Sequence, residues 1–129
     1  MIPYAERERK SIADLITGSI FKAIIDNTHP LGFGYQNSYF SLKLSGTSYD
    51  YLDEGVNVGY FDENTKNVSG YAGSKAVQNV PKSLFLGEES MGKGSIVYMV
   101  DNPLFRSFWE NGKLFMANAV FFLNSNTLE

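Results

Sequence analysis

Few residues of this chain can carry out acid–base, nucleophilic or metal chemistry. The 129 residues include no cysteine and a single histidine, His29. Without cysteine there is no disulfide, no thiolate nucleophile and no cysteine-ligated zinc site. A catalytic zinc usually takes three protein ligands, commonly including two histidines, so His29 alone predicts no metal site. The plainer interpretation of His29 is a loop imidazole that hydrogen-bonds the backbone.

The remaining catalytic patterns are incomplete. A serine triad with His29 as the base lacks a serine in a Gly-x-Ser-x-Gly turn. Gly87 to Lys93 matches the first seven positions of a phosphate-binding loop, but Gly94 stands where the magnesium-binding hydroxyl is needed. A β-branched run follows, where the motif requires the N-terminus of a helix. We interpret this segment as a hairpin turn, and the sequence predicts no catalytic residue.

Two further clusters have a structural and a functional interpretation. Asp50, Asp53 and Glu54 lack the ligand spacing and turn glycine of a calcium loop, which favours a solvated acidic loop. The segment 33–61 is rich in Tyr and Phe, and exposed tyrosines there could stack on a glycan or a peptide. The alternative is that every second ring along two strands lies in the core while the others line an interface.

Composition limits the class of protein. Hydrophobic residues make up 43% of the chain, which is enough for the core of one domain, predicted over residues 1–127. The net charge of -3 argues against nucleic acid and against anionic membranes as partners. No run approaches the roughly 20 apolar residues of a membrane span, and residues 1–10 lack the apolar centre of a signal peptide. Residues 128–129 match a cloning remnant that precedes an affinity tag.

The pattern of apolar residues predicts about five strands with helices at both ends. We expect a helix within residues 5–17 that is stopped by Gly18, and a final helix that is interrupted near Asn111 and Gly112 and resumes through residues 114–122. Asp101, Asn102 and Pro103 read as the start of that final helix. This order indicates an α/β or α+β fold. The predicted strands are residues 20–25, 39–44, 56–61, 83–89 and 95–100.

Several short motifs occur in an order that is similar to one known family. Residues 26–35 read DNTHPLGFGY, and residues 57–60 and 69–71 read NVGY and SGY. Residues 92–97 read GKGSIV, and residues 101–106 read DNPLFR. Together with the closing segment 113–119, these motifs resemble the C-terminal domain of large bacterial zinc carboxypeptidases, best known from Bacteroidetes. In those proteins the peptidase domain precedes a domain similar to class I glutamine amidotransferases.

The resemblance implies a mixed sheet flanked by helices, with a partial amidotransferase-like or flavodoxin-like architecture, in a periplasmic or secreted protein. It carries neither activity to this chain, because the amidotransferase cysteine and the peptidase His-x-x-Glu zinc motif have no counterpart here. Asp101, Asn102 and Pro103 occupy the place of a histidine-bearing segment. Zinc is therefore expected only in the parent peptidase domain, and no cofactor is expected in this chain.

Two functions of different classes follow. The first is a non-catalytic accessory domain that docks on a metallocarboxypeptidase domain and presents an apolar face, through which the isolated chain could also self-associate. The second is a free-standing module that binds a glycan or a peptide through segment 33–61. On either interpretation, His29, Asp101 and Arg106 are the candidate ligand-binding residues. We expect Asp101 or Asn102 to cap the last helix, Arg106 to pair with a carboxylate or a carbonyl, and His29 and Arg106 to share a cleft at the strand ends.

Overall fold

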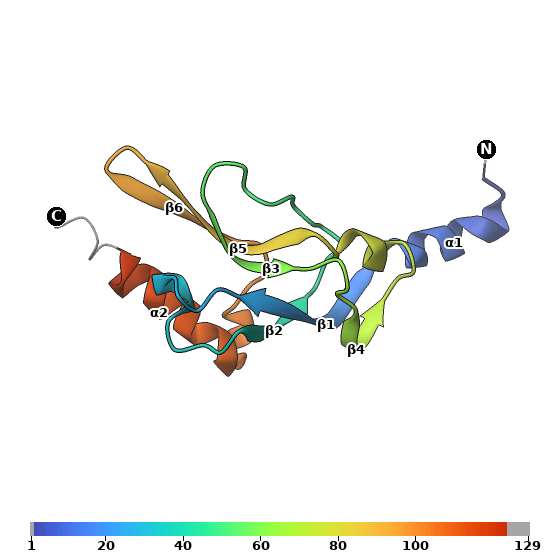
Figure 1. Cartoon of the computed structure of the whole chain (residues 1–129). Helices are drawn as coiled ribbons and strands as arrows, with labels where there is room; N and C mark the ends of the chain where they lie inside the picture. Colours follow the sequence, from blue (N-terminus) through green and yellow to red (C-terminus); the bar gives the residue numbers. More distant parts are fainter. Residues whose placement is uncertain (1, 124–129) are drawn as a thin grey trace.

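A computed structural model describes residues 2–123, so the expected tag remnant at 128–129 lies outside the described residues. Its six strands form one antiparallel sheet that curls into a half-barrel, with a short α-helix at each end of the chain (Figure 1). The path through the sheet is β2-β1-β3-β5-β6, and β4 pairs with β1 beside that path. In chain order the elements are α1 (Tyr4–Ala13), β1 (Ile16–Ile25), β2 (Ser38–Lys43), β3 (Val56–Phe61), β4 (Asn67–Ala72), β5 (Ser83–Met91), β6 (Gly94–Met99) and α2 (Lys113–Phe121).

The predicted mixed, flavodoxin-like sheet is wrong, because every strand pairing described is antiparallel. Parallel neighbours need a crossover of a dozen or more residues, usually a helix. Here α1 precedes the first strand and α2 follows the last, so no α-helix lies between two strands. A short turn joins β5 to β6, and a short turn of this kind produces antiparallel neighbours.

The N-terminal region differs from the prediction at Gly18. The helix ends at Ala13, and Gly18 lies inside β1, at a shift in register against Tyr71 of β4. Gly70, the partner of Ser19, has a φ of +82°, and a Cβ at Gly70 would clash with the carbonyl oxygen of Gly18. The two glycines therefore permit a bulge at which two backbones approach closely. β4 itself was not among the predicted strands.

Aromatic side chains form the centre of the core between the sheet and α2. Tyr39 of β2 lies at their centre, with its ring centroid 5.0 Å from that of Phe85 and 4.9 Å from that of Phe115. Phe21 and Phe61 pack edge to face beside them, at 6.2 Å. All five are buried. Because Phe115 belongs to α2, this cluster attaches the last helix to the sheet.

Three-residue and four-residue 3₁₀ turns connect these elements. They are η1 (Pro30–Gly32), η2 (Ala76–Asn79), η3 (Phe105–Ser107) and η4 (Glu110–Gly112). The segment after β6 was predicted to begin a helix at Asp101, but it forms η3 and η4 before α2 starts at Lys113. The predicted interruption near Asn111 and Gly112 therefore marks the true start of the helix.

Candidate functional site

His29 is held between the backbone and a carboxylate. Its Nδ1 accepts the N–H of Leu31 at 3.2 Å, which is the backbone contact expected from the sequence. Its Nε2 lies 2.8 Å from Oε2 of Glu88 on β5. Since Nδ1 acts as an acceptor, Nε2 carries the ring proton and donates a hydrogen bond to the carboxylate of Glu88. His29 thus joins the loop after β1 to β5, and both of its ring nitrogens already have partners.

Side-chain hydrogen bonds and close backbone packing hold the turn that carries His29. The carboxylate of Asp26 accepts the backbone N–H of Thr28 at 3.0 Å and its hydroxyl at 2.6 Å. These bonds from Thr28 favour the ionised carboxylate and lower the pKa of Asp26. Gly32 closes the turn where a Cβ would clash with the carbonyl oxygen of Asp26. This packing explains why the motif needs a glycine there.

Asp101 belongs to a buried polar cluster that the sequence did not reveal. Its carboxylate accepts the hydroxyl of Ser41 at 2.7 Å and lies 3.1 Å from the ammonium of Lys43. The Lys43 and Asp101 side chains are 1% and 9% exposed. The ammonium also lies 5.4 Å from the centroid of the Phe61 ring. Alternation along β2 could have placed Ser41 and Lys43 on the face of Tyr39, but a lysine in the core is an unusual prediction.

The structure shows no contact that brings Arg106 to His29 or Asp101. Arg106 is exposed, and its guanidinium lies 5.3 Å from the centroid of the neighbouring Phe105 ring. Arg106 and Ser107 have φ angles of 48° and 59°, a strained conformation for residues other than glycine. Asn102, rather than Asp101, caps a turn here by accepting the N–H of Leu104 at 2.9 Å. The three predicted residues therefore take part in three separate interactions.

The loop after His29 packs along one side of α2. Asn118 of α2 is fully buried, and its side-chain amide donates to the carbonyl oxygens of Leu31 at 2.9 Å and Phe33 at 2.8 Å. The ring centroid of Phe33 is 5.2 Å from that of Phe122. Along the rest of α2 the apolar side chains Leu114, Met116, Val120 and Phe121 are exposed. We call Phe33, Met116, Val120 and Phe121 the α2 face.

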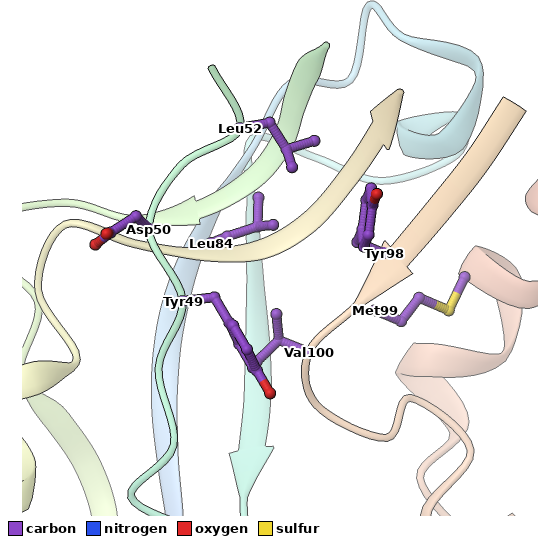
Figure 2. A pocket seen from close by; sticks show the side chains of 7 residues that line it. All are labelled: Tyr49, Asp50, Leu52, Leu84, Tyr98, Met99 and Val100. Atoms are coloured by element: carbon purple, nitrogen blue, oxygen red, sulfur yellow. The ribbon is translucent and has the colours of Figure 1, made fainter. Parts of the chain in front are cut away.

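The Tyr-rich segment divides between core and surface. Tyr39 and Phe61 lie in the core, whereas Phe33, Phe40 and Tyr49 are exposed. Burial raises the pKa of Tyr39 to about 12, and it raises the pKa of Tyr35 also. A hollow of about 540 Å³ lies between the chain around Tyr49 and the end of β6 (Figure 2). It is lined by Tyr49, Asp50, Leu52, Leu84, Tyr98, Met99 and Val100.

The described residues, 2–123, contain no group of three or more His, Asp or Glu side chains placed to hold a metal ion. Within the same part of the chain, no helix is both long and apolar enough to cross a membrane. Comparison of the chain with family models, with curated proteins and with solved structures finds no match.

Proposed function

We propose that this chain is a non-catalytic docking domain whose α2 face is covered by a neighbouring domain of a larger protein. The observation that carries the proposal is the composition of α2. Its sequence, KLFMANAVF, is apolar around most of its circumference, yet only Phe115 and Asn118 are buried. A helix that is apolar all round is normally enclosed by protein. Phe121 is 74% exposed and Val120 is 55% exposed, so no surface within residues 2–123 covers these side chains.

The size of the α2 face favours a tethered neighbour over a second copy. Its exposed apolar side chains present on the order of 400 Å². A stable complex between separate proteins buries about 800 Å² on each partner. A domain in the same polypeptide binds with less area, because the linker raises the effective concentration to about the millimolar range. A small, strongly apolar patch therefore suits an intramolecular interface.

The order of the short motifs in residues 26–119 indicates what kind of domain the neighbour is. These motifs resemble the C-terminal region of bacterial zinc carboxypeptidases, so we propose a zinc peptidase domain as the tethered neighbour. With one histidine and no cysteine, this chain would supply stability or orientation while the neighbour supplies the zinc. The antiparallel sheet gives no support to an amidotransferase-like architecture, so the proposed neighbour rests on the motifs alone.

Cysteine labelling of the natural full-length protein tests the docking. Because the chain has no cysteine, Val120→Cys introduces a single thiol on the α2 face. Val68→Cys is a matched control, since Val68 is 58% exposed and lies on β4. Labelling at each site would be followed by peptide mass spectrometry in the isolated chain and in the full-length protein purified from its source. Docking that buries Val120 for most of the time predicts at least about tenfold slower labelling at that site, and little change at Val68.

The possible outcomes separate the two parts of the proposal. Equal labelling of Val120→Cys in both proteins would overturn the docking, as would a natural product of only about the chain's own 14.4 kDa. If Val120→Cys is protected from labelling in the isolated chain, and more strongly at higher protein concentration, then a second copy of this chain covers the α2 face instead of a neighbouring domain. Protection by a neighbour whose peptides contain no His-x-x-Glu zinc motif would overturn the peptidase assignment and leave the docking intact.

A further inference from the structure

The outer edge of β6 has no strand partner within residues 2–123. On its inner side, the N–H of Val100 donates to the carbonyl oxygen of Phe85 at 3.0 Å, in line with the register of the β5–β6 ladder. Because hydrogen-bonded pairs alternate with non-hydrogen-bonded pairs along an antiparallel ladder, every second residue of β6 directs its N–H and C=O groups away from β5. These residues are Ser95, Val97 and Met99. No hydrogen bond within the described chain uses their backbone groups, so the edge can receive a further strand.

This edge lacks the devices that normally prevent the addition of a strand. Proteins usually protect an open edge with a charged residue, a proline, a bulge or a covering segment. β6 reads GSIVYM, and its register with β5 is unbroken from Leu86 to Met91. The edge of β2, by contrast, is covered where the Asn111 side chain donates to the carbonyl oxygen of Phe40 at 3.3 Å, and β4 has two register shifts against β1. β6 therefore presents a regular edge that residues 2–123 leave open.

We propose that β6 pairs with β6 of a second copy of this chain, antiparallel and around a two-fold axis at Val97. In this register Val97 lies opposite Val97 of the second copy, and Ser95 lies opposite Met99. Every outward N–H and C=O group of both strands then gains a partner. A register shifted by two residues toward the turn would place Met99 opposite Lys93 and leave part of each edge unpaired. The edge is complementary to itself, and this favours a second copy over an unrelated strand.

The side chains of β6 agree with this register. On one face Ile96 lies opposite Tyr98 of the second copy, which sets a β-branched side chain against an aromatic ring, and the symmetry repeats this contact. On the other face the two Val97 side chains meet. Residues 94–99 contain no Asp, Glu, Lys or Arg, so no like charges face each other. The β5–β6 hairpin extends away from β1 and β2 (Figure 1), which leaves its edge accessible to a second copy.

A single pair of strands of this length makes a small interface. It buries less than the roughly 800 Å² per partner of a typical stable complex, so the dimer should be weak and reversible. We expect a dissociation constant on the order of 10–100 μM. β6 shares no residue with the α2 face, so this inference does not depend on the docking proposal.

Amide hydrogen exchange followed by NMR tests the edge residue by residue. At a chain concentration of about 1 mM, exchange at the Val97 N–H should be about fivefold slower than at about 20 μM. The N–H groups of Ile96 and Tyr98 bond to β5 in both states and should show little change. Sedimentation equilibrium over the same range should show the mass rising from 14.4 kDa toward twice that value. A chain that remains monomeric at the highest concentration, or protection that does not alternate along β6, would overturn the inference.

Two matched proline variants locate the contact. Ser95→Pro removes an outward N–H that β5 does not use, and it should weaken the dimer at least about tenfold. Ser90→Pro is the control, because Ser90 is exposed, lies opposite Ser95 in the hairpin and directs its N–H to the other edge, beyond the last ladder pair with β3. Equal dissociation constants for the two variants would contradict the proposed pairing. If Ser95→Pro fails to fold, the exchange pattern at Val97 in the parent chain decides alone.

Discussion

Replacing Asp101 by Asn should destabilise the fold strongly, even though Asn is nearly the same size. Asp101 pairs with the ammonium of Lys43, whose side chain is 1% exposed and rests against Phe61. The variant keeps a hydrogen-bond partner for Ser41 but leaves the ammonium buried without a counter-charge. Removing one partner of a buried ion pair lowers the free energy of unfolding by about 3–5 kcal/mol. Because the variant retains the bond to Ser41, we expect a loss at the lower end of this range, about 3 kcal/mol.

The second half of the test removes the lysine charge as well. Lys43→Met keeps an unbranched chain against Phe61 and leaves no ammonium to desolvate. The double variant should therefore recover about 2 kcal/mol relative to Asp101→Asn alone, a coupling typical of residues in direct contact. Glu110→Gln is the matched control, because Glu110 pairs with Lys113 at the surface, where their side chains are 75% and 44% exposed. An exposed pair contributes less than about 1 kcal/mol.

Urea unfolding, followed by tryptophan fluorescence and circular dichroism, measures these free energies. A loss of about 3 kcal/mol should also lower the thermal midpoint by roughly 10 °C in a chain of this size. The reasoning is refuted if Asp101→Asn costs no more than Glu110→Gln. It is also refuted if Lys43→Met adds its own full cost to that of Asp101→Asn, because the buried charge would then not be the source of the instability.

Two further outcomes follow from the core and from α2. Burial raises the folded-state pKa of Tyr39 to about 12, above its unfolded value near 10. The contribution of this neutral hydroxyl to the free energy of unfolding is therefore complete below pH 10 and is lost as the pH rises toward 12. Urea unfolding at pH 9 to 11 should show stability falling by up to about 1.4 kcal/mol per pH unit for this group, less steeply in Tyr39→Phe. Gly112→Ala should cost at least about 2 kcal/mol in thermal unfolding, because its Cβ would clash with the carbonyl oxygen of Pro103; a midpoint equal to that of the parent chain would contradict the packing.

Local patterns predicted the strands better than their arrangement. The range 56–61 agrees with β3, and the hairpin at residues 90–94 follows from its glycines and the flanking alternation. The parallel component came from the family resemblance, not from the residues. The absence of a predicted helix between any two strands already favoured antiparallel neighbours. β4 was missed because its residues, Asn67–Ala72, are mostly exposed and show no apolar alternation.

The candidate site was harder to predict, because its contacts join distant parts of the chain. The backbone bond of His29 is local and was predicted, whereas its bond to Glu88 spans 59 positions. The pairing of Asp101 with Lys43 spans 58 positions and depends on the path of the sheet. Capping chemistry favoured a helix start at Asp101, but this tertiary contact takes the Asp101 side chain and leaves Asn102 to cap a turn.

The last helix links these contacts to the proposed function. Phe115 packs this helix on the sheet through its contact with Phe85. Yet an apolar stripe on one face needs polar residues opposite, and α2 has only Lys113 and Asn118. Asn118 is buried by the loop of Phe33, and Phe115 is buried against the sheet. Met116, Val120 and Phe121 are exposed on the outer side of the helix. An apolar outer side is unfavourable for a helix that faces water, and it is the arrangement expected of a helix packed between its own sheet and a second protein surface.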